Sequence, residues 1–213
     1  MRKEEKVMRI AVINEVSARD KNKFIIDALG QVNAEVHNIG MSESTDSPEL
    51  TYIHTGLMAA LSLASGAADF VVGGCGTGQG FLISVMQYPG VYCGLITNPL
   101  DAWLFSQING GNCVSLALNK GFGWAGDIEL KYIFDKLFCD APGQGYPPHR
   151  SESQCASRDT LVKINGLTHK DFVAIIKSFD KTILNTVLKH SSFTSFIAKH
   201  AVKGELSGII LNN

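Results

Sequence analysis

The sequence has little charge and no excess of either sign. Charged residues make up 18% of its 213 residues, and the formal net charge is −1. A typical globular protein has about 25% charged residues. No basic stripe is present, so we expect no nucleic-acid partner. The longest apolar stretches fall far short of the ~20 residues that cross a bilayer, so we also expect no membrane contact.

Disulfide and metal frameworks are missing as well. The five cysteines are odd in number and widely spread, without a CxxC pair: Cys75, Cys93, Cys113, Cys139 and Cys155. This pattern is typical of reduced thiols in a cytoplasmic protein. The charged N-terminal residues carry no long apolar segment, which predicts no secretory signal. His37, His169, His190 and His200 have no metal-ligand spacing, so we predict surface or helix-face positions for them, no metal centre and no organic cofactor.

What the sequence does contain is an alternation of short apolar runs with helical segments. Strands are expected over residues 8–14, 34–37, 69–73, 91–96 and 113–118. Helices are expected over 19–30, 49–65, 99–108 and 127–137, with one more starting near Gln79. In the first helix, Phe24, Ile25 and Leu29 should face inward. Such alternation predicts an α/β fold, a Rossmann-like three-layer sandwich with a five-stranded parallel sheet.

The composition changes after Cys139. Residues 140–160 contain three prolines and many polar side chains, which indicates a linker or an arm. Residues 170–203 show helical periodicity, which predicts one or two helices packed on the sheet domain or on a partner subunit. We therefore divide the chain into a Rossmann-like sheet domain, residues 1–139, and a linker plus C-terminal helical extension, residues 140–213.

A glycine-rich loop follows the third expected strand. Residues 73–80 read Gly-Gly-Cys-Gly-Thr-Gly-Gln-Gly, with five glycines in eight positions. In open parallel sheets, ligands bind beyond the carboxyl ends of the strands. Glycines there let backbone N–H groups approach an anion, and such a setting favours the thiolate of Cys75. The loop matches neither the dinucleotide fingerprint nor a P-loop. It therefore predicts a thiolate that removes a proton next to a carbonyl, with amides holding the enediolate oxygen.

The cysteine loop, together with its surroundings, resembles the ribose/galactose isomerase family over roughly residues 8–138. Further residues that carry the resemblance are Tyr52-x-His54, Asn98-Pro99-Leu100-Asp101-Ala102 and Gln107-x-Asn109-x-x-Asn112. The resemblance implies aldose–ketose isomerisation at sites on a homodimer interface, or in a higher homo-oligomer. It implies Cys75 as the base and Thr77 as its catalytic neighbour. The substrate-binding residues that it implies are Glu15, His54, Gly76, Gly78, Gln79, Gly80 and Asn109.

The sequence departs from the family at several of the expected substrate contacts. Val16 stands where the family has a phosphate-binding histidine, and Ile108 stands where it has the ring-opening histidine. The family's C-terminal arginine pair has no clean match, and His149, Arg150 and Arg158 occupy an expanded segment instead. An open-chain acidic sugar needs neither lost histidine, and its carboxylate can pair with these three cations. The resemblance thus favours the family's branch that acts on 4-deoxy-L-threo-5-hexosulose uronate, a product of unsaturated uronic acids.

Two alternatives remain at this point. The chain could be a pentose- or hexose-phosphate isomerase whose phosphate contacts are rebuilt from Arg150, Arg158 and Lys120. It could also be a sugar-binding protein that kept the fold and lost the chemistry. The intact cysteine loop argues against the second alternative, because a binding protein has no need for a reactive thiol.

Overall fold

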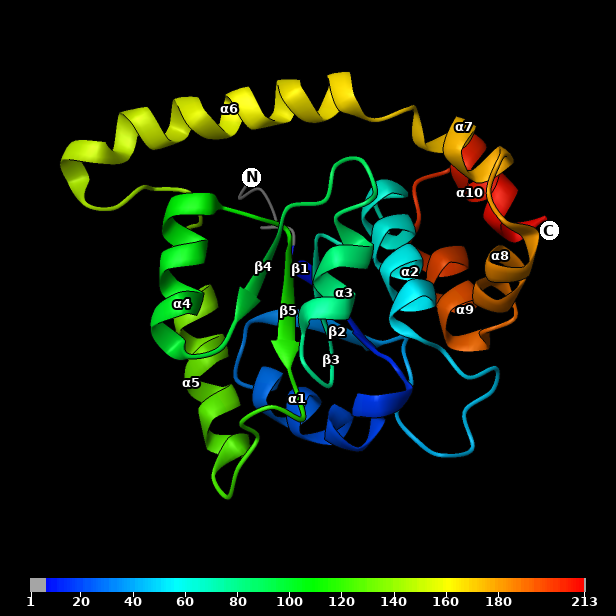
Figure 1. Ribbon diagram of the computed structural model, residues 1–213, viewed down its shortest axis with the longest axis horizontal. Helices are drawn as coiled ribbons and strands as arrows, with labels where there is room; N and C mark the ends of the chain where they lie inside the picture. The colour runs from blue at the N-terminus through cyan, green and yellow to red at the C-terminus, as the bar shows by residue number, and fades with distance from the viewer. Residues whose placement is uncertain (1–6, 213) are drawn as a thin grey trace, which may run out of the picture.

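Five apolar runs form one parallel sheet in the computed structural model, which describes residues 7–212 (Figure 1). The strands are β1 (Met8–Asn14), β2 (Ala34–Asn38), β3 (Phe70–Cys75), β4 (Cys93–Ile96) and β5 (Cys113–Ala117). They lie in the order β2-β1-β3-β5-β4, and every pair is parallel. The predicted fold class is confirmed. The N-terminal residues behind the prediction of no secretory signal lie outside the described range.

Helices cover both faces of the sheet. One face packs against α1 (Asn22–Leu29), α4 (Pro99–Leu104) and α5 (Gly126–Phe138) through a core that includes Ile25, Val114 and Phe134. The other face packs against α2 (Tyr52–Ala64) and α3 (Gln79–Val85). Strands buried on both faces explain the unbroken apolar runs in the sequence.

Two of the predicted helices differ from the structure. The segment predicted as a helix over 19–30 starts as a 3-10 turn, η1 (Val16–Lys21), and becomes α-helical only at Asn22. Phe24 does not face inward: it is 38% exposed and lies against the ring of Phe122, with centroids 5.4 Å apart. Ile25 and Leu29 are buried as predicted.

The helix predicted over 99–108 changes type part-way. After α4 the chain forms a π-helical turn, η2 (Phe105–Asn109), in which the Gly110 N–H donates to the Phe105 carbonyl at 3.0 Å. Gly110 then ends the turn with φ +54°. The extra residue in this turn follows from a backbone hydrogen bond that helical periodicity does not reveal.

The C-terminal extension contains more helix than predicted. A short turn, η3 (Pro148–Arg150), leads directly into α6 (Ser151–Thr168), so half of the predicted linker is helical. Four further helices follow: α7 (Phe172–Lys177), α8 (Lys181–Leu188), α9 (Ser191–His200) and α10 (Glu205–Leu211). Helices α7 to α10 share the core of the α2 side of the sheet.

Helix α6 stands apart from this packing. It has no buried residue, and in Figure 1 it crosses the top of the molecule between the arm and α7. Helices α7 to α10 share a core with the sheet. The division of the chain into two domains at residue 139 stays a prediction. No helix in the described range is long and apolar enough to span a membrane.

Candidate active site

The strand order reverses direction between β1 and β3. From β1 the chain moves outward to β2, then returns to β3 on the other side of β1. At this point the connecting loops diverge and leave room beyond the carboxyl ends of the two strands, where ligands of open α/β sheets bind. Asn14, the last residue of β1, is in register with Gly74 of β3. Glu15 and Cys75 therefore leave the sheet side by side.

Cys75 is the last residue of β3 and is held by its own main chain. Its side chain is buried, with 5% of the residue exposed. Its carbonyl accepts hydrogen bonds from the N–H of Leu118, at 3.0 Å, and of Gly78, at 3.3 Å. The first bond ties the cysteine to the end of β5, and the second closes the first turn of the glycine loop. The backbone at Cys75 is therefore fixed before any ligand arrives.

Two glycines of the loop are required by its geometry. Gly78 has φ +75°, and a Cβ there would lie 2.6 Å from Leu95 Cδ1. Gly73 lies against the ring of Phe81, whose Cζ would be 2.2 Å from a Cβ. The loop can therefore pass between the sheet and α3 only because these positions have no side chain.

Glu15 and the loop are connected through Ser17. The Ser17 hydroxyl donates to Glu15 Oε1 and accepts from the Gly76 N–H at 3.1 Å. Asn119 Nδ2 donates to the Ser17 carbonyl at 2.7 Å, and the Asn119 N–H donates to the Gly76 carbonyl at 2.9 Å. Sequence reasoning found Glu15, which is buried, but missed Ser17 and Asn119. Asn119 follows the carboxyl end of β5, the position from which a contribution is expected in a parallel sheet.

The loop amides are not equally available. The Gly76 N–H donates to the Ser17 hydroxyl. The N–H groups of Gly78 and Gln79 are used inside the loop, and that of Gln79 donates to Thr77 Oγ1 at 3.3 Å. The Thr77 N–H lies in the loop before α3, and the Gly80 N–H lies in the first turn of the helix, where N–H groups have no carbonyl of an earlier turn. The side chain of Thr77 is exposed next to them. An oxyanion at this loop would thus be held chiefly by Thr77 and Gly80.

His54 lies in the first turn of α2, at the same edge of the sheet. Its Nδ1 accepts a hydrogen bond from the Thr51 N–H at 3.0 Å, as in a capping box. This bond places the proton of the neutral ring on Nε2. Burial lowers the pKa of His54, so the ring is neutral at pH 7. The adjacent Tyr52 ring packs on Gly80, which brings α2 against the loop.

Asn109 lies at the opposite end of the strands, where their amino ends meet. Cys75 is in register with Ala117 at the end of β5, whereas Asn109 precedes Cys113 at the start of that strand. The four steps along the five-residue strand from Cys113 to Ala117 alone span about 13 Å. Asn109 is exposed and cannot reach the Cys75 of its own chain.

The three cationic candidates of the extension lie on the Asn109 side. Arg158 donates to the Ile108 carbonyl at 3.0 Å and to the Gly143 carbonyl at 2.6 Å. It is therefore partly buried and holds the arm against η2, whereas the sequence predicted a contact with the substrate. His149 and Arg150 are exposed in η3, on the same arm. One chain thus has two groups of candidate residues, one at the carboxyl ends and one at the amino ends of its strands.

A cavity of about 300 Å³ lies at the carboxyl ends of β4 and β5. Its lining includes Thr97, Ala117, Lys120 and Glu129. The Lys120 N–H also donates to the Gly76 carbonyl at 3.0 Å. The lysine proposed for the phosphate alternative is therefore the one cation of that set that lies on the Cys75 side.

Comparison with known proteins decides the family. The family model described as Ribose/Galactose Isomerase matches residues 10–136. The chain belongs to the ribose/galactose isomerase family. The prediction of a sugar isomerase is thereby confirmed, and the matched range contains the cysteine loop and both histidine replacements. No protein with a curated description matches the sequence.

Two solved structures resemble this isomerase over almost its whole length. A 4-deoxy-L-threo-5-hexosulose-uronate ketol-isomerase complexed with a tartrate is 36% identical, with a TM-score of 0.92, and the match covers 97% of this chain and 100% of that one. A ribose-5-phosphate isomerase, LacAB_rpiB, from Vibrio parahaemolyticus is 40% identical, with a TM-score of 0.93, and the match covers 97% and 99%. Both therefore have counterparts of the C-terminal helices.

A more distant structure shares the fold but not the full length. The type B ribose 5-phosphate isomerase of Leishmania infantum is 19% identical, with a TM-score of 0.64. The match covers 76% of this chain and 99% of that one. About a quarter of the present isomerase has no counterpart there.

Proposed function

We propose that this isomerase converts an open-chain acidic keto sugar, 4-deoxy-L-threo-5-hexosulose uronate, with Cys75 as the base. The observation that carries the proposal is the buried sulfur at the carboxyl end of β3, followed directly by the glycine loop that leads into the first turn of α3. The thiolate removes a proton from C2, and the electron pair moves onto the carbonyl oxygen at C1. A proton then passes from the C2 hydroxyl to the C1 oxygen, and return of the first proton from the Cys75 thiol to C1 leaves the carbonyl at C2 and a hydroxyl at C1.

The glycine loop supplies the electrostatic part of this mechanism. The enediolate oxygen is negative only in the intermediate, and the N–H groups of Thr77 and Gly80 stabilise it there. Glu15 and Ser17 position Gly76 and so keep the loop in shape before the substrate binds. Preformed donors of this kind lower the barrier because they need not reorganise during the reaction.

The choice of an acidic substrate depends on the residues that the sequence lacks. Ile108 cannot exchange a proton with a sugar ring oxygen, so ring opening would be uncatalysed. Val16 cannot bind a phosphate. The similar uronate ketol-isomerase was solved with tartrate, an open-chain hydroxy dicarboxylate, which is consistent with a site for acidic open-chain polyols.

Completion of the site requires a second copy of the chain. Asn109, His149 and Arg150 lie at the amino ends of the strands, away from Cys75. We propose that a dimer places this end of one copy over the cysteine loop of the other. The exposed cations of the arm would then face the substrate carboxylate.

The specific alternative is ribose 5-phosphate, which is favoured by the name of the 40% identical structure and by Lys120 beside the loop. The test compares kcat/KM for the two substrates with the purified protein, with Cys75→Ala as the blank. We expect turnover of the uronate and at least a hundred-fold lower kcat/KM for ribose 5-phosphate. Preferential turnover of the phosphate sugar would contradict the substrate, and full activity of Cys75→Ala would contradict the mechanism.

A further inference from the structure

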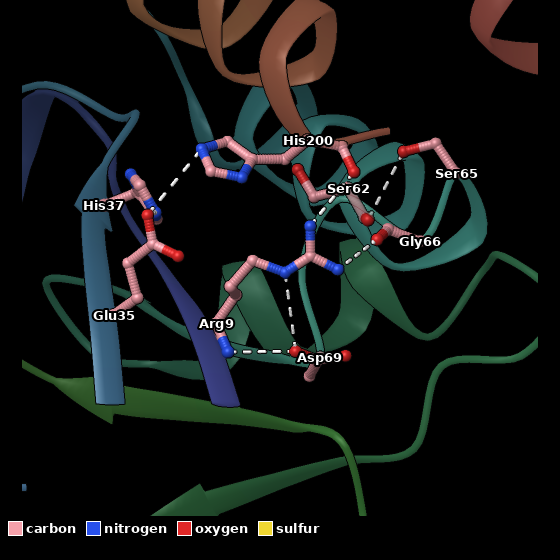
Figure 2. A network of polar contacts seen from close by, with 8 residues as sticks. All are labelled: Arg9, Glu35, His37, Ser62, Ser65, Gly66, Asp69 and His200. Atoms are coloured by element: carbon pink, nitrogen blue, oxygen red, sulfur yellow. Dashed lines mark hydrogen bonds and ion pairs between the residues drawn. The ribbon is translucent and has the colours of Figure 1, made fainter. Parts of the chain in front are cut away.

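A second cluster of polar side chains lies away from the cysteine loop, where the sheet meets the C-terminal helices (Figure 2). Glu35 and His37 come from β2, the edge strand, and His200 is the last residue of α9. One ligand atom from each of the three side chains lies within 4.8 Å of the others. We propose that this cluster binds a divalent transition metal ion of the zinc type and fastens α9 to the sheet.

The distances suit such an ion. Glu35 Oε1 lies 3.0 Å from His37 Nε2 and 3.9 Å from His200 Nε2. A tetrahedral zinc ion with bonds of 2.0–2.1 Å separates its ligand atoms by about 3.3 Å. Two imidazoles and one carboxylate are a common zinc set, and the fourth position is left for water. Small side-chain rotations would bring all three atoms to that spacing.

An unpaired nitrogen points into the same space. His37 Nε2 is buried and has no aligned hydrogen bond with the described residues, although Glu35 Oε1 is close to it. A buried polar atom without a partner normally costs stability. A metal ion at the centre of the cluster would satisfy this nitrogen directly.

The cluster is held in place before any ion binds. Glu35 and His37 are two residues apart on one strand and therefore project from the same face of the sheet. Arg9, in register with Glu35 on β1, donates to the His200 carbonyl at 3.0 Å and to the Gly66 carbonyl at 2.9 Å. The His200 backbone is thus fixed to the sheet.

Charges of both signs surround the cluster. The Arg9 guanidinium lies next to the cluster, but its Nε is 3.6 Å from Asp69 Oδ2, which offsets its charge. Lys199 precedes His200 on α9 and also contributes positive charge. The Glu35 carboxylate is 45% exposed, so an ion can enter from solvent and be partly neutralised by this ligand.

The test uses full-length protein without an affinity tag, treated with chelator and then titrated with Zn²⁺ by calorimetry and metal analysis. We expect one ion per chain and a higher midpoint of thermal unfolding with the ion. His200→Gln and Glu35→Gln should bind at least about ten-fold more weakly, because the loss of a ligand costs at least as much as that of an outer partner. His169→Gln is the matched control and should bind like the wild type.

Cys75→Ser separates this site from the thiol of the cysteine loop. The variant should keep its Zn²⁺ and its thermal shift, since Cys75 lies at the end of β3 and not at β2. No binding to the wild type, equal binding to His200→Gln, or loss of binding only in Cys75→Ser would each overturn the proposal. None of these outcomes depends on sugar turnover, so the result is independent of the proposed function.

Discussion

The proposed proton transfer depends on the sulfur of Cys75, and Cys75→Ala removes only that atom. The side chain is small and sits at a strand end, so the folded state should persist. Loss of a general base lowers the rate by about 10²–10⁴-fold. We expect that fall in kcat, with unchanged circular dichroism. Cys139→Ala, which alters an exposed thiol, serves as the control and should keep full activity.

Thiol labelling tests the reactivity of the same sulfur. Burial, followed by the hydrogen bond to Asp140, raises the pKa of Cys139, so this thiol should react slowly at neutral pH despite its exposure. Cys113 is fully buried, and burial raises its pKa far more. We expect one fast reaction with iodoacetamide, at Cys75, located by peptide mapping. Faster labelling of Cys139 than of Cys75 would contradict a thiolate base.

His54 gives a prediction for the pH dependence of stability. Burial lowers its folded pKa below the usual 6.5, so the unfolded chain binds more protons as the pH falls through that value. The stability that the neutral ring provides is therefore present above pH 6.5 and lost below it. His54→Gln keeps the reciprocal cap, since glutamine also serves at this position. Its free energy of unfolding should fall less than that of the wild type between about pH 7.5 and about pH 5.5.

At the scale of elements, the turn from β3 into α3 depends on Gly78. In Gly78→Ala the left-handed backbone costs roughly 1–2 kcal/mol. The contact with Leu95 adds about 1–3 kcal/mol of overpacking. Gly121→Ala is a matched control, because Gly121 has φ +88° but open space around it. Denaturant unfolding should show the larger loss for Gly78→Ala, and equal losses would mean that the loop can shift away from Leu95.

Helix α6 leaves an apolar stripe in solvent. Leu161, Ile164 and Leu167 follow one another at intervals of three residues and are 52%, 46% and 86% exposed. We expect a second copy of the chain to cover them, because the proposed site needs one. Leu161→Glu combined with Ile164→Glu should shift the mass measured by light scattering to that of a monomer. Lys163→Glu, which points away from those two positions, should leave the mass unchanged.

The whole molecule decides whether the two groups of candidate residues act together. Cys75→Ala and Asn109→Ala should each be inactive or strongly impaired alone. If a site combines Cys75 of one copy with Asn109 of another, a mixed dimer regains one intact site. Random mixing then restores about a quarter of wild-type activity, since half of the dimers are mixed and half of their sites are whole. No recovery after subunit exchange would contradict a shared site.

The sequence by itself determined the sheet and the cysteine loop. Strand runs such as Met8–Asn14 are continuous and apolar because both faces are covered, and that pattern is local. The glycines around Cys75 are local too, since each one permits a turn or a close approach in its own segment. The family resemblance therefore followed from short stretches of chain.

Other features were decided only by the tertiary structure. The π-helical turn at Phe105–Asn109 depends on a backbone hydrogen bond, and α6 keeps its helix without burying a residue. The separation of Asn109 from Cys75 follows from the direction of parallel strands, which places the start and end of a strand at opposite edges of the sheet. His37 and His200 are far apart in sequence, so spacing could not predict their meeting. Only the packing of α9 on β2 brings them together.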